Sequence, residues 1–281
     1  MQNVHPKRIL LVSKAGHAAA GDLCREVAQW LLARGHQATT IAAGQDDRAF
    51  ASPLDLAIVL GGDGTMLGTC RRLAGRAVPI LGINFGRVGF LTEVQPQEWQ
   101  ARLTDCLAGR LPLRRSLVLH WRLLRHGQEL AGGHAVNDVV LGRGTLARLV
   151  CLDITVDDQW LGHLHSDGLV ISTPLGSSSY CVSAGGPLIC PGLDAMTFTP
   201  ICPFLHVIPP MAFPCGSVFH LRVDEGSIDC HITIDGQEGQ AVAIGDVIEV
   251  SCLPGAVLIY GSEIPFFERL RKRGLMPEGK K

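Results

Sequence analysis

Residues 56–65 read Leu56-Ala57-Ile58-Val59-Leu60-Gly61-Gly62-Asp63-Gly64-Thr65, an apolar run followed by a glycine-rich turn that carries one carboxylate. Five apolar residues that stop at glycines predict a buried strand ending in a tight turn. Ligands of open α/β sheets lie at the carboxyl ends of such strands. Glycines let the backbone approach a ligand closely, so a turn that carries Asp63 among three glycines is a candidate phosphate or nucleotide site. The alternative is an ordinary strand-to-helix turn with Asp63 as a capping residue.

The chain up to about residue 110 alternates between strand and helix patterns. Strands are predicted at residues 9–12, 38–43, 56–60 and 78–83. An amphipathic helix is predicted over residues 23–31 because apolar side chains recur there at helical spacing, and Gly35 can close it. A second helix is predicted after Thr65. This alternation predicts an α/β domain with a mainly parallel sheet and helices on its faces.

From about Arg114 the apolar pattern has a period of two, most clearly over residues 117–123 and 228–234. Turn signals punctuate these runs at Asp157-Asp158, Asp235-Gly236 and Pro254-Gly255. The pattern predicts a mostly β domain, arranged as a β-sandwich or as folded sheets. We therefore expect an α/β plus all-β chain. Its N-terminal α/β domain covers residues 1–112 and is completed by a helical tail, 262–281, and its C-terminal β domain covers residues 113–261.

Composition excludes several classes of protein. Apolar residues make up 47% of the chain and charged residues 18%, which is typical of a globular protein. The net charge of −1 gives no basic footprint for nucleic acid. No apolar stretch approaches the ~20 residues that span a bilayer, and the start lacks a signal-peptide pattern. We expect a cytoplasmic chain without a nucleic-acid or membrane partner, whose ten cysteines are reduced and hold no zinc.

Two further motifs are ambiguous when taken alone. Gly82 to Leu91 is a strand followed by a glycine-rich turn whose spacing does not fit the G-x-G-x-x-G fingerprint. It either forms the facing wall of the crevice at Asp63 or is a bare turn. Asn137-Asp138 precedes an apolar strand, and a turn at a strand start is the favoured interpretation, although Asn can pair with adenine and Asp can hold ribose hydroxyls.

The segment from His165 to Pro187 is the densest in polar side chains. A predicted strand over 169–172 leads into a Pro-Gly turn and a hydroxyl-rich run, and such groups suit sugar hydroxyls and phosphates, so a functional role is favoured over a polar loop. His163, His165 and Asp167 could share one strand face, but a structural or substrate-contacting histidine is favoured over a metal ligand. Motifs of P-loop enzymes, protein kinases and serine hydrolases are absent from the sequence.

The ordered set of motifs resembles the bacterial NAD kinases, the ATP-NAD kinase family, over nearly the whole chain. Lipid kinases and phosphofructokinases share the first motif but not the last three. The motifs that carry the resemblance are Gly61-Gly62-Asp63-Gly64-Thr65, Asn84 to Leu91, Asn137-Asp138, Ser166 to Pro187 and Asp235-Gly236-Gln237.

The resemblance implies phosphorylation of the adenosine 2′-hydroxyl of NAD by ATP, giving NADP and ADP, with Mg²⁺ or another divalent metal. It also implies a Rossmann-like α/β domain, a β-sandwich domain that binds NAD, a site between the two, and a homodimer or homotetramer whose sites are often completed by a neighbouring subunit. Asp63 corresponds to the catalytic proton acceptor, and Gly62 and Gly64 line its turn. The implied NAD contacts are Asn137, Asp138, Arg148, His165, Asp167, Ser178, Ser179, Tyr180, Cys181, Val182, Ser183 and Gln237.

The chain departs from the family pattern at a few of these positions. Leu175 stands where a hydroxyl residue is usual, and Ser178 and Ser179 stand for Thr and Ala. His165 replaces an arginine of some relatives, which leaves the choice between NAD and NADH open. The residues also leave open whether Asp63 is a base or a Mg²⁺ ligand and whether polyphosphate replaces ATP. A lipid or sugar kinase and a non-catalytic NAD(P)-binding regulator are the alternative functions.

Overall fold

The computed structural model describes residues 5–45, 48–86, 89–144, 148–205, 208–261 and 264–277. The chain divides into two compact units. The first comprises Met1–Ser116 and Gly255–Pro265, and the second comprises Leu117–Pro254 and Phe266–Lys281. The division after Ser116 lies four residues beyond the expected boundary. The short helix α6 (Phe266–Lys272) groups with the second unit, whereas the sequence assigned the whole tail to the first.

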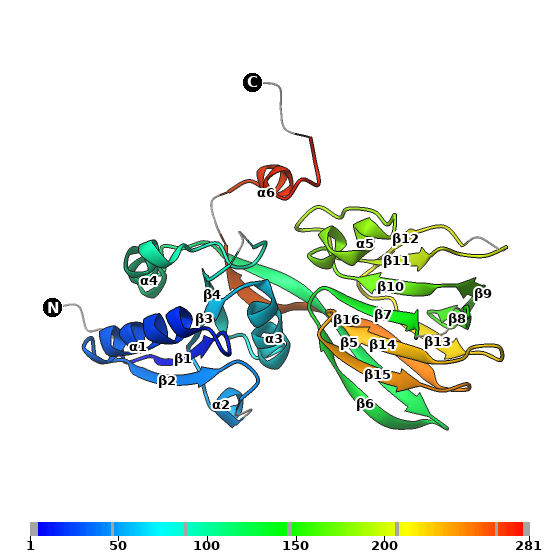
Figure 1. Ribbon diagram of the computed structural model, residues 1–281, viewed down its shortest axis with the longest axis horizontal. Helices are drawn as coiled ribbons and strands as arrows, with labels where there is room; N and C mark the ends of the chain where they lie inside the picture. Colours follow the sequence, from blue (N-terminus) through cyan, green and yellow to red (C-terminus); the bar gives the residue numbers. More distant parts are fainter. Residues whose placement is uncertain are drawn as a thin grey trace. The chain divides into compact units, whose positions relative to one another are not determined.

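The first unit is built on a parallel sheet with the strand order β2-β1-β3-β4 (Figure 1). Its elements are β1 (Arg8–Ser13), α1 (Ala18–Leu32), β2 (Gln37–Ala42), α2 (Arg48–Ala51), β3 (Leu56–Gly61), α3 (Asp63–Leu73), β4 (Pro79–Asn84), the 3₁₀ turn η1 (Pro96–Glu98) and α4 (Trp99–Leu107). The α/β class predicted for this part of the chain is confirmed.

β3 is central to the first unit and is buried along its whole length. Alternate side chains of a strand point to opposite faces. Ile58 and Leu60 belong to one cluster with residues of α1 and α4. Ala57 and Val59, also fully buried, point to the other face, where α3 packs against β3 and β1. The continuous apolar run is therefore explained by helices on both faces, and it places the glycine turn at the carboxyl edge of the sheet.

The second unit consists of two mainly antiparallel sheets, which confirms the predicted β class (Figure 1). One sheet has the order β12-β11-β10-β7-β14-β15, and the other joins β9, β8, β13 and β16, with β5 and β6 attached at β16. The strands are β5 (Leu113–Arg125), β6 (Gln128–Ala135), β7 (Asp138–Arg143), β8 (Val150–Val156), β9 (Gln159–Ser166), β10 (Gly168–Ser172), β11 (Ala195–Ile201), β12 (Met211–Pro214), β13 (Phe219–Val223), β14 (Cys230–Ile234), β15 (Glu238–Val242) and β16 (Val247–Tyr260). A 3₁₀ turn, η2 (Gly176–Ser178), and a short helix, α5 (Tyr180–Ser183), follow β10.

The two sheets share one apolar core, as in a β-sandwich. Phe198 of β11 stacks on Phe219 of β13 with ring centroids 6.0 Å apart, and both side chains are fully buried. Residues of β8 alternate strictly between buried and partly buried positions. The apolar residues that recur with a period of two in the sequence are therefore those whose side chains lie in the core.

Pro254-Gly255, predicted as a turn, lies inside β16, and that prediction was wrong. Proline has no N–H to donate to a sheet, and Gly255 has a left-handed φ of 62°, so the strand bends here without reversing. Before the bend, Val247 to Val250 pair antiparallel with β13, and after it Leu258 and Ile259 pair parallel with β4. The bend changes the partner strand and leaves the chain direction unchanged.

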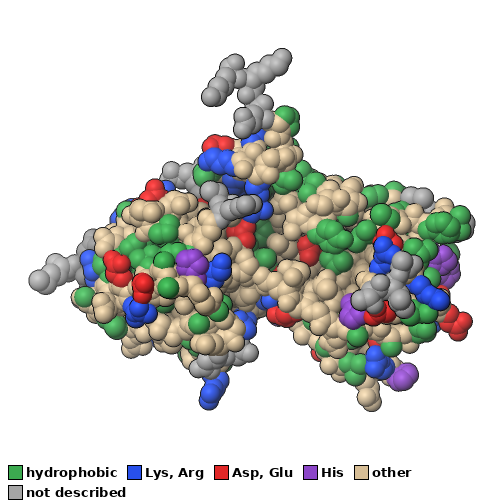
Figure 2. All heavy atoms as spheres, viewed as in Figure 1, with side chains coloured by type: hydrophobic (Ala, Val, Ile, Leu, Met, Phe, Trp, Pro, Cys, Tyr) green, Lys and Arg blue, Asp and Glu red, His purple; other side chains and the backbone are tan. Residues whose placement is uncertain are grey.

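Among the described residues, no helix is long and apolar enough to cross a membrane. On the face drawn in Figure 2, acidic and basic side chains are intermixed. All ten cysteines are free thiols. Their burial varies: Cys24, Cys70 and Cys106 lie in the interior of the first unit, whereas Cys190 and Cys202 are exposed.

We expect Phe198→Ala to lower the free energy of unfolding by about 3–5 kcal/mol, because it removes a fully buried ring from the core. Leu193→Ala is the matched control, since this side chain is 55% exposed and its truncation should change little. Urea-induced unfolding followed by circular dichroism measures both. Equal losses in the two variants would contradict the shared core.

Candidate active site

Asp63 is the first residue of helix α3, with Gly62 as its N-cap, so the helix begins earlier than the predicted position after Thr65. Gly62 offers no side-chain cap. A carboxylate in the first turn is stabilised by the positive end of the helix dipole. The sequence alternative of Asp63 as a capping residue is therefore close to what is observed, with the carboxylate one position inside the helix.

The Asp63 carboxylate accepts hydrogen bonds from the backbone of a second loop. Its Oδ2 accepts the N–H of Phe90 at 2.8 Å, and its Oδ1 accepts the N–H of Leu91 at 3.0 Å. Thr92 adds two longer contacts to Oδ1, from its N–H and its hydroxyl, both at 3.4 Å. These contacts hold the carboxylate against residues 90–92.

Two glycines permit this close approach. A Cβ atom built at Gly89 would overlap Asp63 Oδ1 and lie 2.7 Å from the Thr92 hydroxyl. A Cβ atom at Gly82 would lie 2.9 Å from the Thr92 methyl carbon. The glycine-rich motif from Asn84 to Leu91 therefore contacts the turn of Asp63 through its described last residues, whereas Arg87 and Val88 lie outside the described residues.

In the second unit, three of the sequence motifs meet at one end of neighbouring strands. β7 lies between β10 and β14 (Figure 1), and Asp138 at its start pairs with Ser172 at the end of β10. Thr173 donates its N–H to the carbonyl of Asn137 at 2.9 Å, and Asp235 donates its N–H to the carbonyl of Asp138 at 3.0 Å. Asn137-Asp138, the segment after β10 and the Asp235 turn thus form one continuous network.

The Asp138 side chain is 4% exposed and makes no hydrogen bond to any residue that the structure describes. Burial and the nearby Asp235 carboxylate raise the pKa of Asp138 from 3.8 to about 7. At neutral pH its carboxyl group is therefore shared between the neutral form, which donates one hydrogen bond, and the charged form, which only accepts them. An unpartnered buried carboxyl group is suited to binding a ligand hydroxyl.

The residues of η2 and α5 have mixed environments. Ser178 is buried, and its hydroxyl donates to the carbonyl of Leu175 at 3.1 Å, so Leu175 contributes a backbone oxygen although it lacks a hydroxyl. Cys181 is fully buried with its Sγ 3.3 Å from the Thr197 hydroxyl, which gives this thiol a packing role. The partly or fully exposed residues of this run are Ser179, Tyr180, Val182 and Ser183.

Arg148, His165 and Asp167 lie apart from this network. Asp167 directly precedes β10 and is paired with Arg143, its Oδ1 3.2 Å from the Arg143 Nε. Asp138 lies opposite Ser172, the last residue of β10, and Asp167 lies five residues before Ser172, so the two aspartates stand at opposite ends of this strand, about 16 Å apart at ~3.3 Å per residue. Arg148 and His165 are exposed. Within one chain the predicted NAD contacts therefore form two groups, one at each end of β10.

Sequence reasoning named neither Thr173 nor Asp235 as a site residue, and Asp235 entered it as a hairpin turn and as part of the family motif Asp235-Gly236-Gln237. Thr173 is fully buried, and its hydroxyl donates to the Val136 carbonyl at 2.7 Å and accepts the Gly176 N–H at 3.0 Å. Gln237, which was predicted, is exposed in the turn after β14. No local pattern marks Thr173 because its partner lies 37 residues away along the chain.

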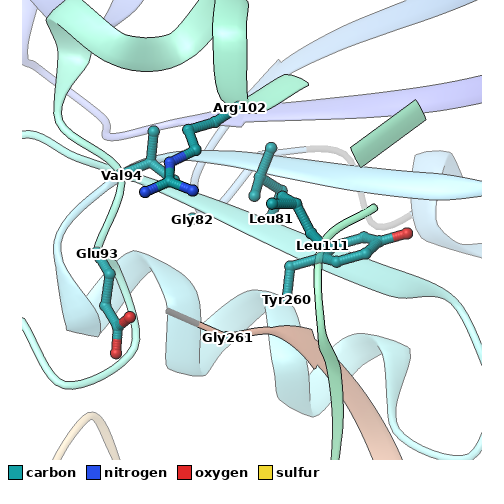
Figure 3. A pocket seen from close by; sticks show the side chains of 8 residues that line it. All are labelled: Leu81, Gly82, Glu93, Val94, Arg102, Leu111, Tyr260 and Gly261. Carbon is teal, nitrogen blue, oxygen red and sulfur yellow. The ribbon is translucent and has the colours of Figure 1, made fainter. Parts of the chain in front are cut away.

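A separate cavity of about 30 Å³ lies in the first unit between β4, α4 and the end of β16 (Figure 3). Its lining residues are Leu81, Gly82, Glu93, Val94, Arg102, Leu111, Tyr260 and Gly261. This volume holds about one water molecule, and its lining includes none of the predicted catalytic or NAD-binding residues. We regard it as a packing defect. Among the described residues, no cluster of three or more His, Cys, Asp or Glu side chains could hold a metal ion.

We expect Gly89→Ala to lower the free energy of unfolding by about 1–3 kcal/mol, because the added Cβ displaces the Asp63 carboxylate from residues 90–92. Gly86→Ala in the same loop is the control, since its Cβ would meet only Asn84 Oδ1 at 3.7 Å, an ordinary contact. Thermal unfolding compares the two variants with the wild type. If Gly89→Ala is as stable as Gly86→Ala, the close approach is not required.

The raised pKa of Asp138 predicts a pH-dependent gain in stability for Asp138→Asn. Between the ordinary pKa of 3.8 and the folded value of about 7, the folded chain retains a proton that the unfolded chain has released. Wild-type stability therefore falls through this window as the pH rises, while the neutral asparagine is unaffected. We expect the variant to match the wild type near pH 4 and to exceed it increasingly up to pH 7, in urea unfolding at fixed ionic strength. A stability difference that does not change with pH would contradict the assignment.

Family comparisons agree with the order of these motifs along the chain. Residues 45–111 match the family described as the ATP-NAD kinase N-terminal domain, and residues 136–260 match the ATP-NAD kinase C-terminal domain. An NAD kinase of Nitratidesulfovibrio vulgaris (strain DP4) is 50% identical over 254 residues, which cover 89% of this chain and 85% of that protein. An NAD kinase of Lawsonia intracellularis is 34% identical over 274 residues, 96% of both chains.

Solved structures share the fold. Yeast NADH kinase complexed with NADH superposes with a TM-score of 0.83 at 22% identity, covering 99% of this chain and 90% of that one. An NAD kinase from Archaeoglobus fulgidus in complex with ATP gives a TM-score of 0.77 at 21% identity, covering 96% of this chain and all of the other. With two family domains matched in order and relatives that are 34–50% identical over most of their length, the chain belongs to the NAD kinase family.

Proposed function

We propose that the chain transfers the γ-phosphoryl group of ATP to the adenosine 2′-hydroxyl of NAD, giving NADP and ADP, with Asp63 as the proton acceptor. The observation that carries this proposal is the network of the second unit, in which Asn137-Asp138, the segment after β10 and the Asp235 turn are joined by hydrogen bonds. These are the motifs that distinguish the NAD kinase pattern from kinases that share only the Asp63 turn.

The chemistry proposed for Asp63 is compatible with its hydrogen bonds. The Asp63 carboxylate accepts the N–H groups of Phe90 at 2.8 Å and of Leu91 at 3.0 Å. The Thr92 contacts at 3.4 Å exceed the usual length of a strong hydrogen bond. The loop holds the carboxylate in one orientation, and in this orientation it accepts the proton of the attacking 2′-hydroxyl. General base catalysis of this kind typically contributes about 10²–10⁴-fold in rate.

The divalent metal fits this site as part of the substrate Mg-ATP. Mg²⁺ is usually held by one or two carboxylates together with substrate phosphates and water. Asp63, the first residue of α3 at the end of β3, offers a carboxylate of this kind. When bound with ATP, the metal supplies neutralisation of the phosphate charge. The side chains of the chain itself bind NAD, orient its ribose and accept the proton.

Asn137 and Asp138 are proposed to bind the adenosine part of NAD. An asparagine amide pairs with the edge of adenine, and the buried Asp138 carboxyl group is suited to a ribose hydroxyl. Arg148, His165 and Asp167 belong to the group at the other end of β10. Their distance from Asp138 favours the implication of the resemblance that a neighbouring subunit completes each site, in a homodimer or homotetramer.

The test is NADP formation by purified protein from NAD and Mg-ATP, read with an NADP-specific dehydrogenase. We expect Asp63→Asn to reduce kcat by roughly 10²–10⁴-fold with little change in the Kd for NAD, because the proton acceptor is lost while the nucleotide contacts remain. A variant with near wild-type turnover would refute the base assignment.

Thr92→Val serves as the matched control, because it removes the hydroxyl contact to Asp63 at 3.4 Å and keeps the carboxylate. It should retain most of the activity. A wild-type protein that binds NAD but forms no NADP from ATP or polyphosphate would favour the regulator. A protein that does not bind NAD would favour a lipid or sugar kinase.

A further inference from the structure

Asp235 has an unusual placement for a residue of a hairpin turn. It lies in the three-residue turn between β14 and β15 with a left-handed φ of 51°, followed by Gly236 with a φ of 63°, and Gln237 donates its N–H to the Ile234 carbonyl at 2.9 Å. Aspartates in such turns commonly face the solvent. Asp235 is only 9% exposed, and its carboxylate accepts hydrogen bonds from residues 136–138, at the start of β7. β7 is the strand next to β14 in the sheet (Figure 1).

Three consecutive backbone N–H groups converge on this carboxylate. Oδ1 accepts from Val136 at 3.0 Å, from Asn137 at 2.7 Å and from Asp138 at 3.1 Å, and Oδ2 accepts from Val136 at 3.1 Å. Hydrogen bonds to an ionised acceptor are stronger than neutral ones. The donors are 97–99 residues away along the chain. The three N–H groups therefore form an anion-binding site, and the anion that occupies it is the protein's own Asp235 carboxylate.

The carbonyl groups of the same segment are held from the opposite side. Thr173 binds the carbonyls of Val136 through its hydroxyl and of Asn137 through its N–H. Gly176 packs so closely on Asn137 that an added Cβ would overlap the Asn137 carbonyl oxygen. Both the N–H and the C=O groups of the segment are therefore fixed, and the directions in which the Asn137 and Asp138 side chains leave the backbone are fixed with them.

We propose that Asp235 is a positioning residue of the NAD-binding site, which acts through the backbone of residues 136–138 and through its charge on Asp138, without touching NAD itself. This inference rests on the proposed function, because it assigns Asn137 and Asp138 to the adenosine part of NAD. Asp235 holds the two side chains in the geometry that the ribose and the base require.

The charge of Asp235 gives the proposal a second, independent readout. Asp235 is the described charged group that raises the pKa of Asp138, together with burial. From β10, Asp138 faces Ser172, which is uncharged, and the turn of residues 174–178 contains no titratable side chain. NAD binding should therefore change with pH near 7, and removal of the Asp235 charge should move that change to lower pH.

The decisive variant is Asp235→Asn, which keeps the size of the side chain but loses its charge and one of its acceptor atoms. We expect the KM for NAD to rise roughly tenfold or more, the KM for ATP to stay unchanged, and the pH inflection of NAD binding to move to lower pH. Glu238→Gln is the matched control, because it removes a carboxylate from the exposed side of the same hairpin. Glu238→Gln should change neither the KM for NAD nor the pH inflection of NAD binding.

Thr173→Val distinguishes the effect of the backbone position of residues 136–138 on NAD binding from the effect of the Asp235 charge. It removes the hydroxyl bonds to Val136 and Gly176 while the Asp235 carboxylate stays in place. We expect a raised KM for NAD with an unmoved pH inflection. If Asp235→Asn does not fold, Asp235→Glu replaces it, since glutamate keeps the charge but displaces the carboxylate, and it should behave as Thr173→Val does.

Calorimetric titration with NAD distinguishes failure of this inference from failure of the proposed function, because it needs no turnover. If the wild type binds NAD but forms no NADP, the kinase assignment fails and the positioning role is still read from the binding constants. The inference would be overturned if the Asp235→Asn variant bound NAD with the wild-type affinity. It would also be overturned if the variant bound NAD more weakly but the pH inflection of NAD binding stayed where it is in the wild type.

Discussion

Hydrogen bonds from backbone N–H groups to a partly or fully buried carboxylate hold together the segments on which the site depends. In the first unit Asp63 binds residues 90–92, and in the second unit Asp235 binds residues 136–138. Neither segment can satisfy these N–H groups within a regular strand, and a buried N–H left unpaired is costly. One carboxylate satisfies several of them at once. The same interaction therefore removes an energetic penalty and fixes the loop geometry.

The hydrogen bonds to Asp235 also bear on the two neighbouring carboxyl groups of the second unit, Asp138 and Asp235. Asp138 and Asp235 lie close together in a buried setting, and two neighbouring carboxylates disfavour double ionisation. The Asp235 carboxylate accepts three backbone N–H groups, whereas Asp138 has no such donors to its side chain among the described residues. Burial and the nearby Asp235 carboxylate raise the pKa of Asp138 to about 7. The placement of Asp235 therefore affects both the backbone geometry at Asp138 and the pKa of its carboxyl group.

The β-sandwich explains why these side chains can be arranged so tightly. β7 is flanked on both sides by antiparallel strands, β10 and β14, so the end of each neighbour arrives at the start of β7. The paired register fixes Asp138 opposite Ser172, and the core beneath, with Phe198 stacked on Phe219, keeps the sheets in place. The same register separates Asp138 from Asp167 by the length of β10, which limits what one chain can assemble by itself.

The sequence by itself determined the class of both units, the strand that ends at Asp63, and the family. These depend on local order: an apolar run that stops at glycines, an alternation with period two, and motifs in a fixed succession. It did not determine that Asp63 begins the helix and binds Phe90, that Pro254-Gly255 bends a strand instead of reversing it, or that Thr173 and Asp235 hold Asn137. Those contacts join residues 27 to 99 positions apart. Their distances and directions exist only once strands far apart in the chain have paired in register, so the tertiary structure alone decided them.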